Sequence, residues 1–198
     1  LLVEGVDTFT KVSIIPRGMA GGYTLTPPKE DKHYLTKNEL LGRITVFFGG
    51  LVGEELFMND TTTGVSNDLE NVSRIARAMI CEYGMSPLGK MAFGKNQRHV
   101  FLGRDLMDHQ KDYSEDTARQ IDEEVRNTVD QCYQTARRLL TENRDKLDII
   151  AKRLIEKEII DIDETCDLLG LPKPEHLVDE NDETPPTEPV QESTGETA

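Results

Sequence analysis

A short run of polar residues in the first half of the chain places a carboxylate at the predicted start of a helix. The run is Thr61–Glu70, with the sequence TTTGVSNDLE. Asn67 is predicted to cap the helix, and Glu70 can reach back to the cap as in a capping box. Asp68 then lies in the first turn, where the helix dipole favours a negative charge and the side chain can still point away from the helix. A short carboxylate held in this way can reach a metal ion beyond the helix end, although an acidic first-turn residue often serves only the helix itself.

The histidines of the chain do not complete a metal site or a nucleophile–base pair. They are His33, His99, His109 and His176. No two of them are close in sequence. A zinc peptidase with a helical site needs two His one turn apart and a Glu beside the first, HExxH, and no such motif occurs in this sequence. We therefore interpret each His as a surface residue.

Two helices are expected to frame the carboxylate-bearing run. Thr36–Glu39 is typical of a capping box, and the apolar residues of 40–52 keep helical spacing after it. The pair Gly49–Gly50 inside this helix costs about 1 kcal/mol per glycine relative to Ala. We therefore expect another backbone or helix to pass close to the pair. The next helix is expected to begin at Asn67 and to end near residues 83–84.

Short strands are predicted before these helices and an irregular segment after them. Lys11–Ile15 is a β-branched run that Pro16 ends, and Tyr23–Thr26 is a second short strand. Residues 84–112 are rich in glycine, with one further strand expected near Val100–Leu102.

The last third of the chain is predicted to be helical. Ser114 should cap a helix whose apolar residues keep alternating three and four spacing as far as Leu139. A second helix is expected to carry an apolar face over Leu147–Ile159. A short third helix, Asp163–Leu169, should end at Gly170, which suits the residue after a helix.

Composition excludes several classes of protein. The chain has 198 residues and a formal net charge of −14, which argues against a nucleic-acid role because such a role needs a basic face. Residues 175–198 hold eight of the 37 acidic residues and no Lys or Arg, and this Pro/Thr/Glu-rich tail is expected to be disordered. Cys81, Cys132 and Cys166 form no CxxC pair, so a reduced compartment is expected rather than a disulfide framework. No run of about 18 apolar residues predicts a membrane span, and no signal peptide is recognisable.

Ordered segments along the chain resemble the proteolytic region of FtsH-type ATP-dependent zinc metalloproteases, peptidase family M41. These segments are Lys11–Gly18, Gly22–Thr24, Gly49–Glu55, Thr62–Leu69, Glu82–Met85, Phe101–Asp105, Tyr113–Glu115 and Ile121–Val125. The resemblance covers nearly all of residues 1–172. In that family the segment similar to Thr62–Leu69 supplies the third protein ligand to the catalytic zinc. The resemblance therefore implies that Asp68 is this ligand.

The same resemblance places the family's HExxH helix a few residues before the segment that matches Leu1–Val3. Both zinc-binding His residues and the catalytic Glu would then precede this sequence. Trimming of the chain and a natural truncation would each explain this, and the start at a residue other than Met favours trimming.

Two further groups near the zinc are implied by the resemblance. Glu54 lies on the helix that the family packs near the metal, and it is expected to hydrogen-bond a metal-bound His. The alternative is an ordinary charged surface pair with Glu55. Gly21–Thr24 resembles an exposed edge strand beside the active site, where an extended substrate could pair with the backbone. The alternative is a plain sheet edge.

The implied fold is mainly α with a small β element, of the zincin-like M41 type. Residues 1–112 would form the C-terminal portion of the zinc peptidase core, 113–172 a helical subdomain packed against it, and 173–198 the disordered acidic tail. The implied function is that of the proteolytic domain of a membrane-anchored, ATP-dependent zinc metalloprotease that degrades unfolded or damaged membrane and soluble proteins. Zn²⁺ would be its cofactor. ATP and Mg²⁺ would enter only through an upstream ATPase module, since the sequence has no Walker motif.

The implied assembly is a homo-hexamer at the cytoplasmic face of the bacterial inner membrane, anchored by segments upstream of this sequence. Its substrates would be unfolded polypeptides. The alternative, from a different class, is a non-catalytic, ring-forming helical interaction module. The residues that precede Leu1 in the gene discriminate the two, because an HExxH there favours the enzyme and a degenerate motif favours the module.

Overall fold

The computed structural model describes residues 1–18, 21–27, 34–94 and 113–174 and confirms a mainly helical fold with a small sheet. The elements in chain order are β1 Lys11–Ser13, β2 Tyr23–Leu25, α1 Lys37–Met58, the 3₁₀ turn η1 Thr63–Val65, α2 Ser66–Cys81, α3 Glu115–Glu142, α4 Arg144–Lys157, β3 Ile159–Asp161 and α5 Ile162–Leu169. The predicted strand near Val100–Leu102 and the acidic tail lie outside the described residues. None of the helices in the described ranges combines the length and the apolar character needed to cross a membrane.

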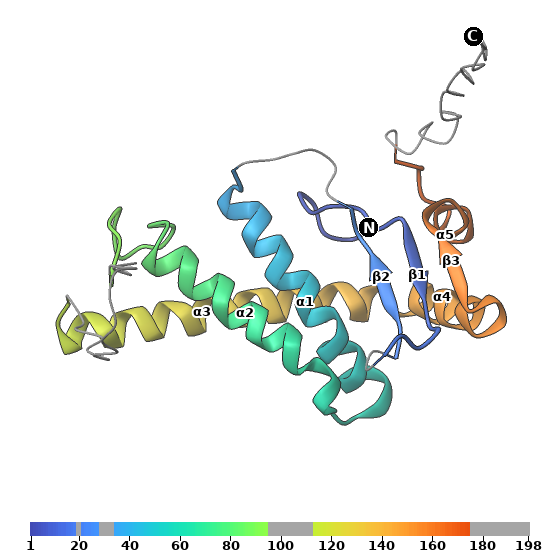
Figure 1. Ribbon diagram of the computed structural model, residues 1–198, viewed down its shortest axis with the longest axis horizontal. Helices are drawn as coiled ribbons and strands as arrows, with labels where there is room; N and C mark the ends of the chain where they lie inside the picture. The colour runs from blue at the N-terminus through green and yellow to red at the C-terminus, as the bar shows by residue number, and fades with distance from the viewer. Residues whose placement is uncertain (19–20, 28–33, 95–112, 175–198) are drawn as a thin grey trace, which may run out of the picture.

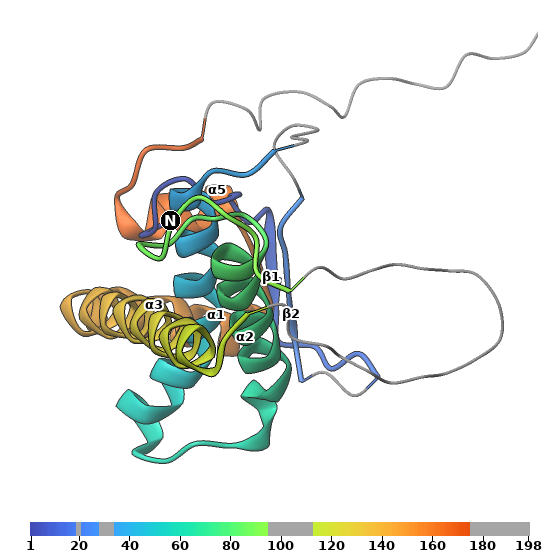
Figure 2. The same ribbon diagram turned by 90° about the vertical axis from the view of Figure 1, so that its left-hand side faces the viewer.

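The helices form a crossed arrangement with the sheet at one end. Helices α1 and α2 run antiparallel and side by side, and both pack on the long helix α3 (Figure 1). Figure 2, seen from the left side of Figure 1, shows α1 and α2 together on one side of α3. The sheet has the strand order β2-β1-β3 and lies near the end of α3 from which α4 and α5 continue.

The main core forms where α1, α2 and α3 meet. Helix α1 contributes a buried residue at every fourth position, which keeps one face of the helix turned inward. The buried cluster consists of Leu40, Ile44, Phe48, Val52, Val72, Ile75, Ala76, Met79, Cys132 and Ala136. The ring of Phe48 also meets the ring of Tyr133 edge to face, with centroids 5.6 Å apart. Because this core joins residues on both sides of residue 112, the predicted helical subdomain packs directly on the preceding part, while the boundary itself stays a prediction.

Three of the predicted helix ends are confirmed. Thr36 and Glu39 form the capping box of α1, with the Glu39 backbone N–H donating to the Thr36 hydroxyl and the Thr36 N–H donating to the Glu39 carboxylate. The hydroxyl of Ser114 accepts a hydrogen bond from the Thr117 N–H at the start of α3. Gly170 ends α5 in the left-handed region, with φ 63°. Local capping chemistry therefore predicted these ends correctly.

The glycine pair in α1 meets two different surroundings. A Cβ at Gly50 would lie 3.6 Å from a carboxylate oxygen of Asp68, so the start of α2 does pass close to this position. A Cβ at Gly49 would meet nothing within 4 Å, so no described part of the chain passes close to this glycine. Gly49 instead borders an apolar cavity of about 250 Å³, which extends to Leu1 and Phe9 and is walled by residues of α1, α3, α4 and α5.

The strand β3 was not predicted from the sequence. The pattern over Leu147–Ile159 predicted a helix to its last residue, but α4 ends at Lys157 because Glu158 turns into the left-handed region with φ 64°. Ile159 then begins β3, in which Ile160 is buried and pairs with Val12 of β1. Strand β3 forms by pairing with β1, which lies far away in the sequence. The helical spacing of apolar residues therefore cannot predict it.

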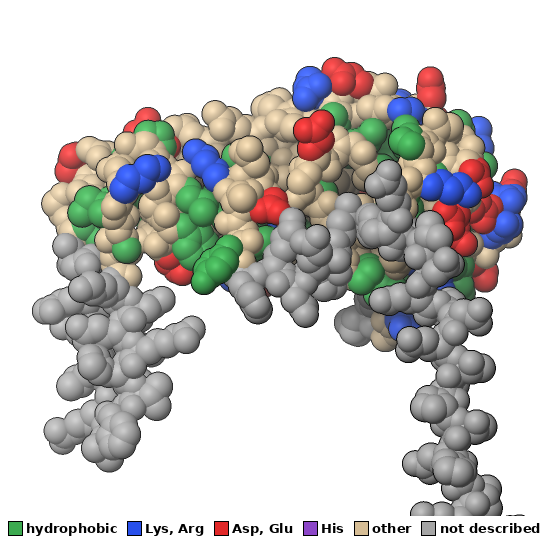
Figure 3. Space-filling model, turned by 90° about the horizontal axis from the view of Figure 1, so that it is seen from above, with side chains coloured by type: hydrophobic (Ala, Val, Ile, Leu, Met, Phe, Trp, Pro, Cys, Tyr) green, Lys and Arg blue, Asp and Glu red, His purple; other side chains and the backbone are tan. Residues whose placement is uncertain are grey.

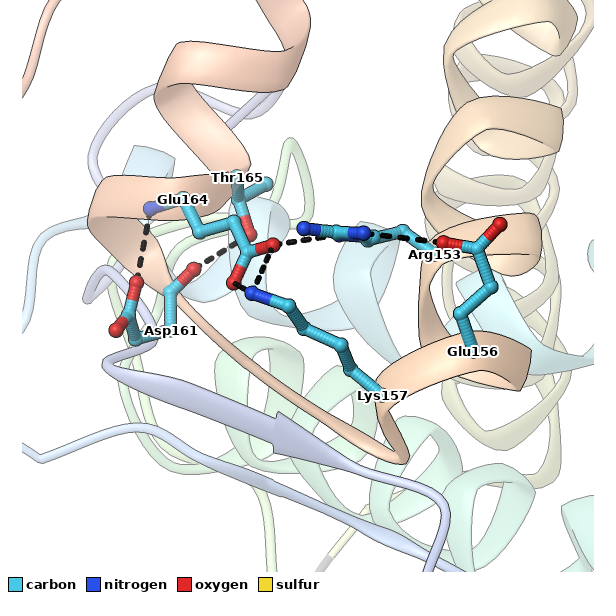
Figure 4. Close-up of polar contacts among 6 residues, drawn as sticks. All are labelled: Arg153, Glu156, Lys157, Asp161, Glu164 and Thr165. Carbon is cyan, nitrogen blue, oxygen red and sulfur yellow. Dashed lines mark hydrogen bonds and ion pairs between the residues drawn. The ribbon is translucent and has the colours of Figure 1, made fainter.

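A network of charged residues ties α4, β3 and α5 together (Figure 4). The Glu164 carboxylate accepts a hydrogen bond from Arg153 Nε at 2.6 Å and another from Lys157 Nζ at 3.0 Å. Asp161 caps α5 by accepting from the Glu164 N–H, and its carbonyl accepts from the Thr165 hydroxyl. In Figure 3, acidic and basic side chains gather together at the right-hand end of the molecule, which is the end that carries α4 and α5 in Figure 1.

This network predicts a pH-dependent contribution to stability. Hydrogen bonds from Lys157 and then Arg153 hold the pKa of Glu164 below its usual value. A lowered folded-state pKa stabilises the fold above the unfolded-state pKa of about 4.3, and this contribution is lost as the pH falls through the folded-state value. Glu164→Gln should therefore lower the melting temperature at pH 7, and the difference from wild type should shrink below about pH 4.

The matched control is Glu156→Gln, because Glu156 pairs with Arg153 alone among the described residues and its side chain is 65% exposed. This variant should melt close to wild type at every pH. A Glu164→Gln difference that stayed constant from pH 7 to pH 3 would contradict the assignment of the effect to the ionised carboxylate. Melting curves followed by circular dichroism measure both variants.

Candidate metal site

Asp68 lies in the first turn of α2, as the sequence predicted, and faces α1. Its side chain is half-buried at the position where Gly50 leaves room in front of the carboxylate. Among the described residues, no hydrogen bond or ion pair reaches this carboxylate. Burial raises the pKa of the Asp68 carboxyl, and no cation in the described ranges offsets the loss of water. A carboxylate in this situation suits a cation that the protein chain does not itself provide.

The predicted helix cap at Asn67 is wrong. Helix α2 begins one residue earlier, at Ser66, and its start carries no side-chain cap. The 3₁₀ turn η1 runs directly into α2, so that the Ser66 N–H donates to the Thr63 carbonyl. The capping residue is Thr62, whose hydroxyl accepts from the Gly64 N–H at 3.1 Å. Because η1 runs directly into α2 and the Ser66 N–H already has a partner, neither Asn67 nor Glu70 forms a cap.

Glu54 and Glu55 point to different neighbours at the end of α1. The carboxylate of Glu54 accepts from the Thr62 N–H at 2.6 Å and from the Thr62 hydroxyl at 2.7 Å. Glu55 instead accepts from the Tyr133 hydroxyl at 2.6 Å, and Arg137 lies 3.6 Å from the same carboxylate. The hydrogen bond to Glu55 is the main cause that raises the pKa of Tyr133. The two acids are therefore not a free charged pair, since one holds η1 and the other holds α3.

The structure places Gly21–Thr24 at an edge of the sheet. Strand β2 pairs only with β1 in the order β2-β1-β3, which leaves its other side without a strand partner in the described part of the chain. Arg17 lies over the ring of Tyr23, 5.2 Å from its centroid. A Cβ at Gly22 would come within 2.5 Å of the Ser13 carbonyl oxygen, whereas a Cβ at Gly21 would meet nothing within 4 Å. Gly22 is thus required for β2 to approach β1, and Gly21 is not.

This difference predicts unequal effects of two similar substitutions. Gly22→Ala should displace β2 from β1, because the backbone oxygen of Ser13 cannot yield as a flexible side chain does. Hydrogen exchange at the β2 amides should become faster, and casein turnover by the intact protein should fall if substrate pairs with this edge. Gly21→Ala is the control and should match wild type in both measurements. Equal behaviour of the two variants would contradict the close approach at Gly22.

The described residues do not form a complete metal site. They contain no group of three His, Cys, Asp or Glu side chains placed to hold one ion. A catalytic zinc usually takes three protein ligands and one water. Asp68 fits as one of those ligands, because its carboxylate is half-buried and lacks a partner in the described ranges. A zinc ion held by Asp68 would need further ligands from outside the described residues.

Two contacts near this site were not anticipated from the sequence. The hydrogen bonds from Thr62 to Glu54 join the loop before α2 to the last turn of α1. The bonds among Glu55, Tyr133 and Arg137 join that same turn to α3. The sequence did contain a signal for the first contact, because Thr62 stands two residues before Gly64 in a run of residues that favour caps and turns.

Comparison with known proteins places this chain in one family. The family model of peptidase family M41 matches residues 1–168. The chain is 47% identical over 155 residues to the ATP-dependent zinc metalloprotease FtsH of Acidobacterium capsulatum, covering 78% of this chain and 24% of the relative. It is 49% identical over 163 residues to FtsH 2 of Alkaliphilus metalliredigens, covering 82% and 24%. It is 42% identical over 171 residues to FtsH of Bacillus subtilis, covering 85% and 27%.

The chain therefore belongs to peptidase family M41, the family of zinc metalloproteases that the resemblance of its motifs indicated. More narrowly, it is similar to the FtsH-type ATP-dependent members of that family. It spans about a quarter of the length of these relatives.

Proposed function

We propose that this chain is the part of an ATP-dependent zinc metalloprotease's proteolytic region that binds the catalytic zinc through Asp68. Membership of family M41 supports a peptidase, and the names of the relatives support zinc. The observation that carries the proposal is the carboxylate of Asp68, which is half-buried beside Gly50 and has no partner among the described residues. Burial raises the pKa of Asp68, and a bound cation would favour the ionised form again.

The remaining ligands would come from an HExxH helix that precedes Leu1 in the intact protein. The apolar cavity beside Gly49 supports this placement, because Leu1 forms part of its wall and an amphipathic helix packs its apolar side chains against apolar residues. Gly49 and Gly50 are adjacent on α1 and point about 100° apart, so the cavity and the Asp68 carboxylate border neighbouring sides of this helix.

The chemistry would be the hydrolysis of peptide bonds. Zinc supplies a Lewis acid and lowers the pKa of a bound water. Asp68 would contribute a negatively charged oxygen held at a fixed helix start, and Gly21–Thr24 would present backbone groups to an extended substrate. Recognition through the backbone requires little of the substrate's side chains. It therefore suits an enzyme that acts on many unfolded or damaged polypeptides.

The intact protein would work as a membrane-anchored homo-hexamer at the cytoplasmic face of the bacterial inner membrane. ATP and Mg²⁺ would serve an ATPase module upstream of Leu1, as the names of the ATP-dependent relatives suggest. Its substrates would be unfolded membrane and soluble proteins. The acidic balance of the chain supports a role without nucleic acid.

Removal of the metal tests the proposed function. The intact protein, treated with a chelator and dialysed, should lose casein hydrolysis and regain it when zinc is added. ATP hydrolysis by the same preparation should change little, because the proposed zinc site lies outside the ATPase module. Casein turnover that continued in the zinc-free protein would contradict the proposal, and a protein that assembled without ever cleaving casein would favour the non-catalytic interaction module.

A further inference from the structure

Both carboxylate oxygens of Glu54 accept hydrogen bonds from Thr62, the one described residue that bonds to this side chain. The Thr62 N–H donates to Oε2 at 2.6 Å, and the Thr62 hydroxyl donates to Oε1 at 2.7 Å. This pair of bonds closes the loop that connects α1 to η1. Hydrogen bonds to an ionised acceptor are stronger than neutral ones, so the carboxylate is a suitable anchor for the loop.

Thr62 connects the Glu54 carboxylate to the turn that precedes α2. Its hydroxyl donates to Glu54 and accepts from the Gly64 N–H at 3.1 Å, which caps η1. The Ser66 N–H in turn donates to the Thr63 carbonyl, so η1 continues without a break into α2. Since α2 has no side-chain cap of its own, the position of its first turn depends on η1.

The same face of α1 contacts Asp68 and η1. Gly50 and Glu54 are one turn apart on α1 and therefore lie on one side of the helix. A Cβ at Gly50 would lie 3.6 Å from an Asp68 carboxylate oxygen, and a Cβ at Gly64 would lie 3.8 Å from a Glu54 carboxylate oxygen. These two close contacts place η1 and the first turn of α2 against one short stretch of α1.

We infer that Glu54 is a positioning residue for Asp68 that acts through Thr62. The inference rests on the proposed function, because it takes Asp68 as a zinc ligand. It adds to the expectation that the resemblance gave for Glu54, because each carboxylate oxygen accepts a hydrogen bond from Thr62. A ligand held by an outer partner commonly loses about 10- to 100-fold in metal affinity when that partner is removed.

The test is a double-mutant cycle in the intact protein with Glu54→Gln, Thr62→Val and the double variant. The zinc dissociation constant is measured by competition with a chromophoric chelator, and casein turnover is measured beside it. Each single variant should weaken zinc binding about tenfold or more. The double variant should be no weaker than the weaker-binding single variant, because both changes break one connection. Thr62→Ser keeps the hydroxyl and should bind zinc like wild type.

Glu55→Gln is the matched control, because Glu55 is the neighbouring acid but bonds to Tyr133 of α3. It should leave the zinc dissociation constant within about twofold of wild type, below the loss expected for an outer partner of a ligand. Wild-type zinc binding by Thr62→Val, together with a loss in Glu54→Gln, would overturn the inference in favour of direct contact with a metal-bound His. Additive losses in the double variant would overturn it as well.

The failure of this inference and the failure of the proposed function give different results. If Asp68→Asn binds zinc like wild type, the proposed function fails whatever the cycle shows. If Asp68→Asn loses zinc and Thr62→Val does not, only the role of Glu54 fails. Hydrogen exchange at the Gly64 amide gives a readout independent of activity, and it should become faster in Thr62→Val and in Glu54→Gln but not in Glu55→Gln.

Discussion

Asp68→Asn in the intact protein is expected to reduce casein hydrolysis to background and to lower bound zinc far below one ion per subunit. Asn keeps the size of the side chain and tolerates a helix start, but it replaces the anionic oxygen that the metal needs. The half-buried carboxylate has no partner among the described residues, so its loss breaks no bond that the described part of the fold uses. The melting temperature of the zinc-free protein should therefore stay equal to wild type or rise slightly.

Asp60→Asn is the matched control for this prediction. Asp60 is an exposed acid in the loop between α1 and η1, and its carboxylate accepts only the N–H of Thr61 among the described residues. This variant should retain zinc and turnover. Metal analysis, casein turnover and melting curves on the three proteins decide the outcome, and full turnover by Asp68→Asn would show that Asp68 is only an acidic residue of the first helical turn.

Residues 1–198 alone are expected to hydrolyse no casein, even with zinc added. The sequence contains no HExxH, and the described residues contain no group of three side chains that could hold one ion. One carboxylate cannot hold a catalytic zinc that takes three protein ligands, so binding should be weak and non-specific. The same chain extended upstream to include an HExxH segment should gain zinc-dependent turnover.

The extended chain carries its own control, in which the Glu of the HExxH is replaced by Gln. This variant should bind zinc and remain inactive, because it keeps the His ligands and loses the general base. Zinc-dependent cleavage by residues 1–198 would contradict the account. It would mean that a complete site lies within this sequence.

Much of the helical fold was readable from local patterns. The apolar residues of α1 recur every fourth position from Leu40 to Val52, and this spacing alone predicts both the helix and its buried face. The caps at Thr36 and Ser114 depend only on residues within one turn. The prediction that Asp68 lies in a first helical turn was also correct, because the observed start of α2 differs from the predicted start by a single residue.

The errors arose where distant residues decide the local structure. Asn67 has the chemistry of a cap, but the 3₁₀ turn held by Glu54 through Thr62 removes the need for one. Ile159 continues the apolar spacing of α4, and only pairing with β1 makes it part of a strand. The role of Glu54 could not be read from sequence for the same reason, since the course of the loop determines which group its carboxylate meets.

Anomalous diffraction at the zinc absorption edge, from crystals of the intact protein, tests the central claim most directly. We expect one zinc ion per subunit with a carboxylate oxygen of Asp68 as a ligand, at about 2.0–2.2 Å. A fully occupied zinc whose protein ligands exclude Asp68, with this carboxylate turned to solvent, would contradict it.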